Sequence, residues 1–220
     1  MKKLILAVIV VAAGVAGAVW YSGVFSRTMD DFTKISALCS TIPAPEESDA
    51  AMAGIGWAPL DTTRISEAAE AIALFHVATR RSGAQAFDPV AEQDTFDARL
   101  AEAEALLADP ATKAYGRDTD NGIVVLSADT RVPLSKDCDI FLPETAGADG
   151  FAMLVAGLDP QTETAGFATW TQGYNPDAPR PGPTVMNLTT VDANAAELVD
   201  FLGRPARFTF YSRNSYRGAE

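Results

Sequence analysis

The chain has 220 residues, of which 48% are hydrophobic and 21% are charged, so it can bury a core and is not disordered as a whole. It carries 29 acidic and 17 basic residues, a formal net charge of −12 at pH 7. This balance argues against nucleic acid and anionic lipid surfaces as partners, because both require a basic surface.

Residues 1–25 form an export segment. Lys2 and Lys3 precede an uncharged run, 4–25, whose 22 residues would make a helix of about 33 Å, enough to cross a hydrocarbon core of about 30 Å. Trp20 and Tyr21 stand where an interfacial aromatic belt is expected. We therefore expect a single transmembrane anchor that binds the protein to the membrane through residues 4–25.

A cleaved signal peptide is the alternative. Ala16-Gly17-Ala18 resembles a small-residue cleavage site, so cleavage near Ala18 would release a secreted or periplasmic protein. Lysines on the short N-terminal side place the N-terminus in the cytoplasm by the positive-inside rule. Under the anchor interpretation the protein is a single-pass inner-membrane protein whose C-terminal domain lies in the periplasm. That exported part has 15 basic and 29 acidic residues, a net charge of −14.

Helical spacing dominates the first part of the exported chain. An amphipathic helix is predicted from Phe32 to Ile42, and a short second helix follows Pro45 and ends at Gly54. A longer helix is predicted over 62–81, then a loop over 82–93. Asp94 is expected to cap the next helix, which ends before Pro110. Residues 30–109 are therefore predicted to be helical.

The pattern changes near Asp118. Strands are predicted at 123–126, 137–142, 165–171, 184–190 and 207–212, with helices near 150–157 and at 192–202. Residues 118–213 thus read β-β-α-β-β-α-β. We predict an α+β fold in which a helical half packs on a mainly antiparallel sheet, all within one extracytoplasmic domain, 26–220.

The two cysteines, Cys39 and Cys138, are predicted to form a disulfide. The export segment places both outside the cytoplasm, where disulfides persist, and the chain offers neither of them another partner. The bond would join the helical half to the β-rich half. The alternative is a pair of unrelated buried thiols.

The chemistry-bearing residues are few. The single histidine, His76, excludes a His-rich metal site and lies on the apolar stripe of helix 62–81, where a core or boundary role is commoner than catalysis. No G-x-S-x-G, S-x-x-K, H-E-x-x-H or C-x-x-C motif occurs. Residues 118–122 begin like a calcium loop but lack the glutamate at the twelfth position, so a turn is predicted. No catalytic, cofactor-binding or metal-binding residue is predicted.

A basic patch is predicted near the C-terminus. The last strand should place Phe208 and Phe210 on one face and Arg207, Thr209, Tyr211 and Arg213 on the other, with Arg204 and Arg217 nearby. Such arginines can hold a carboxylate or phosphate, although pairing with acidic residues of the same chain is the commoner arrangement.

These patterns favour a non-catalytic role. We expect a membrane-anchored extracytoplasmic binding or interaction protein of a bacterial envelope, with an envelope protein as a possible partner. The alternative is a small envelope hydrolase that uses His76 as a base, with a serine or carboxylate brought close by folding.

Overall fold

The computed structural model describes residues 31–41, 44–79, 89–117, 122–128, 135–143, 155–160, 162–164, 166–173 and 185–216. The export segment lies outside these ranges, so anchor and signal peptide both stay predictions. Among the described residues no helix has the length and apolar character needed to cross a membrane. The predicted turn at 118–122 also lies outside them, apart from Gly122.

The helices lie close to their predicted positions. The helices of the described residues are α2 (Asp31–Thr41), the 3-10 helix η1 (Pro45–Glu47), α3 (Ser48–Gly54), α4 (Thr62–Thr79), α5 (Pro89–Ala108) and α7 (Ala196–Leu202). The start predicted for α5 was wrong: the helix begins at Pro89, and Asp94 lies inside it. Proline suits the first helical turn because its fixed φ is helical and its missing N–H would have no partner there.

Eight strands form one sheet in the described part of the chain. They are β1 (Ala58–Pro59), β2 (Lys113–Gly116), β3 (Ile123–Ala128), β4 (Lys136–Leu142), β5 (Thr162–Thr164), β6 (Phe167–Gly173), β7 (Val185–Val191) and β8 (Phe210–Tyr216). Their order is β1-β2-β3-β4-β8-β7-β6-β5, and every neighbouring pair is antiparallel. The α+β fold and the antiparallel sheet are therefore confirmed.

Three short strands were not predicted from the sequence. β1, β2 and β5 have two to four residues each, too few to show an alternating pattern. The sheet consequently begins at Ala58 and not near Asp118. Most of the helix predicted near 150–157 lies outside the described residues, which resume at Val155.

The predicted register of the last strand was partly wrong. β8 begins at Phe210, three residues later than expected, so Phe208 lies before the strand and does not share a face with Phe210. Phe208 packs in the core beside α4, whereas Phe210 packs on the opposite side of the sheet. Tyr211 and Arg213 do lie on one face, as predicted, because they alternate within β8.

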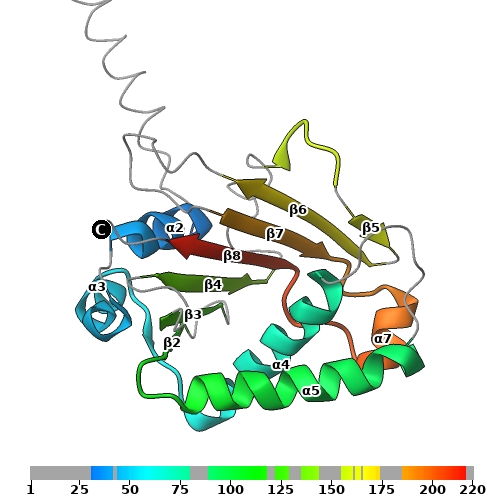
Figure 1. The fold of residues 1–220 in the computed structure, drawn as a ribbon, viewed down its shortest axis with the longest axis horizontal. Helices are drawn as coiled ribbons and strands as arrows, with labels where there is room; N and C mark the ends of the chain where they lie inside the picture. Colours follow the sequence, from blue (N-terminus) through cyan, green and yellow to red (C-terminus); the bar gives the residue numbers. More distant parts are fainter. Residues whose placement is uncertain are drawn as a thin grey trace, which may run out of the picture.

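Helices cover both faces of the sheet, which the sequence did not indicate. One core joins α4, α5 and α7 to strand residues such as Ile123, Val125 and Phe141. The other joins α2 and α3 to the alternate residues, such as Val124 and Leu126. Figure 1 shows α4 and α5 lying side by side along their face of the sheet. The candidate functional site lies on this α4/α5 face.

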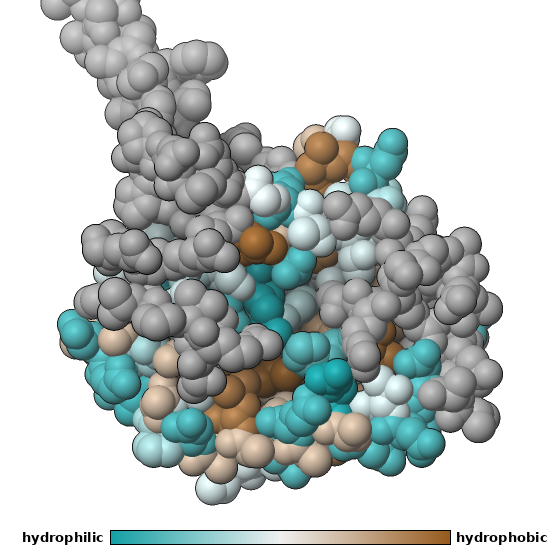
Figure 2. Space-filling view, viewed as in Figure 1, coloured by the Kyte–Doolittle hydropathy of each residue, from teal (hydrophilic) through white to brown (hydrophobic). Residues whose placement is uncertain are grey.

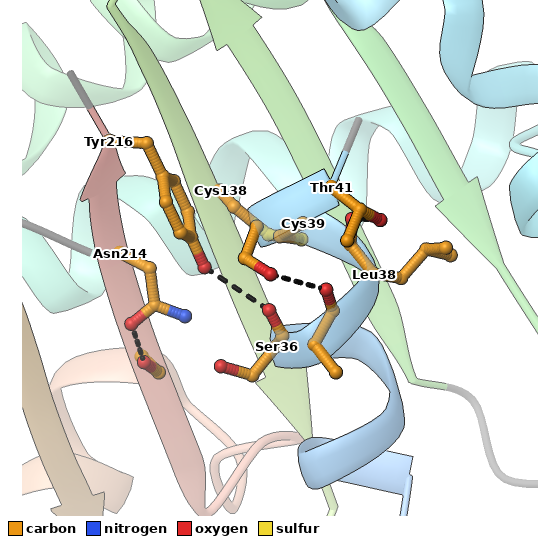
Figure 3. The surroundings of a disulfide bond; sticks show 10 residues. Ser36, Leu38, Cys39, Thr41, Cys138, Asn214 and Tyr216 are labelled. Carbon is orange, nitrogen blue, oxygen red and sulfur yellow. Dashed lines mark hydrogen bonds between the residues drawn. A yellow bond between two sulfur atoms is a disulfide. The ribbon is translucent and has the colours of Figure 1, made fainter. Parts of the chain in front are cut away.

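The predicted disulfide is present. Cys39 of α2 and Cys138 of β4 are bonded, with their Cα atoms 6.3 Å apart, and both side chains are fully buried. Figure 3 shows the bond between the helix and the sheet, next to the hydrogen bond from Tyr216 Oη to the Ser36 carbonyl oxygen, 3.2 Å. The disulfide therefore fixes α2 to a central strand on the face opposite the site.

Candidate functional site

Polar side chains form a row across four strands on the α4/α5 face. Asp139 of β4 pairs with Arg213 of β8, which pairs with Asn187 of β7, which pairs with Thr171 of β6. Residues in direct register share a face of an antiparallel sheet. This row lies beside the aromatic row of Phe141 and Tyr211, so the face changes from apolar to polar along each strand.

A second polar row lies next to the first. Ser127 of β3, Asp137 of β4 and Ser215 of β8 are in register, and the Ser215 hydroxyl donates a hydrogen bond to Asp137 Oδ1 at 2.6 Å. The two rows together form a polar floor at one end of the sheet.

The Asp139 carboxylate is the centre of a buried network. Arg213 donates from Nε and Nη2 to its two oxygens, at 2.7 and 2.8 Å, and Tyr211 Oη donates to Oδ1 at 2.9 Å. Asp139 is 0% exposed and the Arg213 side chain 21%. A buried carboxylate is stable in this position because three hydrogen bonds, two of them from the bidentate guanidinium, replace its hydration.

The pKa values of this network fix its protonation. Burial raises the pKa of Tyr211 well above its ordinary value, with Asp139 adding to the effect, so the phenol keeps its proton. Burial alone would lower the pKa of Arg213, but the adjacent Asp139 carboxylate outweighs it and raises this pKa. Arg213 therefore remains a fixed cation at the base of the site.

His76 of α4 reaches the same network. Its Nε2 lies 3.4 Å from Arg213 Nη1, where it can accept from the guanidinium if the ring proton is on Nδ1. Burial lowers the pKa of His76 below 6.5, and the positive charge of Arg213 lowers it further, while Asp139 partly opposes the shift. His76 is therefore neutral at pH 7.

His76 and Arg213 line an open cavity of about 390 Å³ between α4, α5 and strands β3, β4 and β8. We call it the His76 pocket; it is lined by Ile72, His76, Arg99, Glu102, Ala103, Leu106, Ser127, Ala128, Asp137 and Arg213. In Figure 2 hydrophilic side chains gather at the centre of this face, and an apolar area lies beside them toward α5. The volume is at the small end of the range for ligand sites.

The His76 pocket carries charges of both signs. On α5, Arg99 Nη1 and Glu102 Oε2 form an ion pair at 2.5 Å at its edge. Asp137 and Arg213 contribute a carboxylate and a guanidinium from the sheet. The cavity is thus polar and close to charge-balanced, in a chain that is strongly acidic as a whole.

The predicted hydrolase arrangement is met only in part. Folding brings Ser127 and Asp137 into the pocket that contains His76. The contact of His76 Nε2, however, is with the Arg213 cation, and the three donors of Arg213 and Tyr211 engage the Asp139 carboxylate. The geometry favours binding over base catalysis.

The arginines of the predicted basic patch that the structure describes pair with acids; Arg217 lies outside the described residues. Arg207 pairs with Glu67 of α4, and Arg204 pairs with Glu70 of the same helix. Arg213 presents its bidentate edge to Asp139. Pairing within the chain therefore prevails over a bidentate anion site on this strand.

Lys2, Lys3, Trp20 and Tyr21, the expected flanks of the anchor, lie outside the described residues. Among the described residues, no group of histidine, cysteine and acidic side chains is arranged to hold a metal ion.

Sequence reasoning missed Asp139 and its role. The available signal was the alternation Asp137, Asp139, Phe141 in an otherwise apolar strand, which places two acids on one face. Nothing in the sequence paired that face with Arg213 or with His76. Comparisons of the chain with protein-family models, curated proteins and solved structures gave no match.

Proposed function

We propose that this is a membrane-anchored extracytoplasmic binding protein of a bacterial-type envelope, with the His76 pocket as its site for a small polar ligand. The observation that carries the proposal is the cavity of about 390 Å³ lined by Arg213, whose guanidinium is held in place by the buried Asp139 carboxylate. Because buried partners hold the Arg213 side chain in one orientation before a ligand arrives, binding costs less side-chain entropy.

The location rests on independent features. The uncharged run 4–25 after Lys2 and Lys3 supports export, and the Cys39–Cys138 disulfide is consistent with an oxidising compartment. N-terminal sequencing of the mature protein tests the anchor. We expect the intact leader, and a mature N-terminus at Val19 would replace the anchor with a cleaved signal peptide.

The binding function is tested by ligand retention. The full-length protein in detergent is incubated with the small-molecule fraction of an envelope extract, ultrafiltered and washed, and its retained compounds are identified by mass spectrometry. Leu106→Trp adds bulk at a partly buried position of α5 that lines the pocket, and Ala101→Trp adds a tryptophan at an exposed position of the same helix. We expect a compound retained by the wild type and by Ala101→Trp but not by Leu106→Trp. Equal retention by all three proteins would contradict the proposed site.

A second candidate, a small hydrolase, is favoured by one observation: the Ser127 side chain lines the same pocket as His76. It predicts turnover of a chromogenic acetyl ester that is lost in both Ser127→Ala and His76→Gln. Turnover that survives either substitution would remove this candidate, because nucleophile and base act together.

A further inference from the structure

We propose that the His76 pocket binds a small uncharged polyol, such as a single sugar ring, with hydroxyls hydrogen-bonded to Ser127 and Arg213. This inference rests on the proposed binding function and adds the chemical class of the ligand. It follows from three features of the lining: a serine hydroxyl without a partner, charged groups already engaged within the protein, and an apolar wall beside the polar groups.

The Ser127 hydroxyl is directed to the cavity with nothing to bind. Ser127 is 6% exposed, stands in register with Asp137 on the α4/α5 face of the sheet and lines the cavity. Within the described part of the chain this hydroxyl makes no hydrogen bond, whereas the hydroxyl of Ser215 in the same row donates to Asp137. A nearly buried hydroxyl without a partner costs free energy. A ligand hydroxyl can supply the missing bond, because each hydroxyl both donates and accepts.

The charged side chains of the pocket are engaged by other groups of the protein. Arg213 donates two hydrogen bonds to the buried Asp139 carboxylate. Arg99 forms an ion pair with Glu102, and Asp137 is held by Ser215 and by a further contact. A ligand with a net charge would have to compete with these partners. An uncharged ligand can instead add hydrogen bonds and leave every pair in place.

Two guanidinium groups keep donors that these pairs do not use. The contacts of Arg213 with Asp139 and His76 take at most three of its five N–H groups. Arg99 donates from Nη1 to Glu102, which leaves further N–H groups on a side chain that is 26% exposed. Hydroxyl oxygens on adjacent carbons of a polyol can accept from such donors. Because Asp139 holds Arg213 in one orientation, its share of the binding costs little side-chain entropy.

The apolar part of the lining comes from the helices. Ile72 of α4 and Ala103 and Leu106 of α5 line the cavity, and Figure 2 shows an apolar area toward α5 beside the hydrophilic centre of this face. A sugar ring has the same two-sided character, with hydroxyls at its edge and C–H groups on its faces. A cavity of about 390 Å³ is at the small end for ligand sites, which suits one ring better than an oligosaccharide.

The test follows the imidazole resonances of His76 by NMR while single probes are added at constant pH and ionic strength. The full-length protein is kept in a detergent without a sugar headgroup. Glucose, galactose, mannose and myo-inositol are the polyols, and cyclohexanol, inorganic phosphate and methylammonium are the comparison probes. We expect at least one polyol to shift the His76 resonances with saturation and to bind at least about tenfold more tightly than each comparison probe.

Two variants locate the bound polyol. Ser127→Ala should weaken its affinity about three- to tenfold and leave Tm unchanged or higher, because the substitution removes no hydrogen bond within the described protein. Ser66→Ala makes the same change at an exposed position of α4 and should alter neither value. Leu106→Trp, which adds bulk inside the pocket, should abolish the shift.

Each other outcome overturns the inference in a recognisable way. Tighter binding of phosphate or methylammonium would leave the binding function in place with a charged ligand. Polyol binding that persists in Leu106→Trp would lie outside the pocket, and equal affinity of Ser127→Ala and wild type would remove the hydroxyl contact. Failure of all four polyols would reject the ligand class, and the retention experiment would then decide the binding function separately.

Discussion

Replacing Asp139 with alanine should strongly destabilise the domain. The substitution removes the acceptor of three hydrogen bonds, two from Arg213 and one from Tyr211, in a position with no solvent access. It also leaves the Arg213 guanidinium, whose side chain is only 21% exposed, without its counter-ion. Removing one partner of a buried ion pair costs about 3 to 5 kcal/mol, because the remaining charge stays desolvated.

A double variant separates the cost of leaving the Arg213 charge buried from the loss of the attraction between Asp139 and Arg213. Asp139→Ala with Arg213→Met removes both charges and keeps an apolar chain of similar length, so the double variant should be more stable than Asp139→Ala alone. Asp200→Ala is the matched control, because an exposed carboxylate of α7 should contribute within about 0.5 kcal/mol.

The measurement is thermal unfolding of the full-length protein in detergent, followed by tryptophan fluorescence, since Trp57 is buried in the domain. At roughly 2 to 4 °C per kcal/mol for a domain of this size, Asp139→Ala should lower Tm by about 6 to 20 °C. A shift no larger than that of Asp200→Ala, or strictly additive single variants, would show that the Asp139–Arg213 pair is not the buried network described above.

Three other predictions concern the core, the disulfide and pH. Phe208→Ala should lower the free energy of unfolding by about 3 to 5 kcal/mol, because this ring is buried and its centroid lies 5.8 Å from the centroid of the Phe141 ring. Arg207→Glu should lower it by about 1 kcal/mol or less, because the ion pair between Arg207 and Glu67 is partly exposed. Equal Tm values for the two variants would contradict this difference. Replacing both Cys39 and Cys138 by alanine should lower the free energy of unfolding by about 2 to 5 kcal/mol, because the disulfide closes a loop of 99 positions. Thiol titration of the denatured, non-reduced wild type should find no free thiol. Two free thiols would refute the bond. The pKa of His76 is lowered in the folded protein, so the unfolded chain binds the histidine proton more readily, and stability should fall as the pH drops from about 6.5 through the folded pKa. Urea unfolding measured over this pH range should show the fall in the wild type and not in His76→Gln. Identical pH profiles for the two proteins would refute this prediction.

The helices and the disulfide could be predicted because each depends on local pattern or on counting. The apolar spacing that begins at Phe32 is visible within one helix, and two exported cysteines allow one pairing. The start of α5 was missed because Pro89 was read as part of a loop, although proline is common in a first helical turn.

The site could not be predicted because it depends on strand order. Arg213 meets Asp139 only because β8 inserts between β4 and β7, so that β4 and β8, with four other described elements between them in the chain, become neighbours. His76 was placed on an apolar stripe, yet α4 crosses the point where the sheet face becomes polar, so the ring meets Arg213. The start of β8 at Phe210, three residues later than predicted, likewise depends on tertiary contacts, such as the hydrogen bond that Thr209 N donates to the Leu142 carbonyl oxygen just before the strand.

The most direct test of the binding site uses His76, the only histidine in the chain, as a spectroscopic probe. Its imidazole carbon and proton resonances are recorded by NMR on full-length protein without a histidine tag, before and after addition of the small-molecule envelope fraction. A ligand in the pocket should shift these resonances in the wild type and leave them unchanged in Leu106→Trp. Resonances that do not move in the wild type, at concentrations where a ligand is retained on ultrafiltration, would contradict the assignment of the His76 pocket as the binding site.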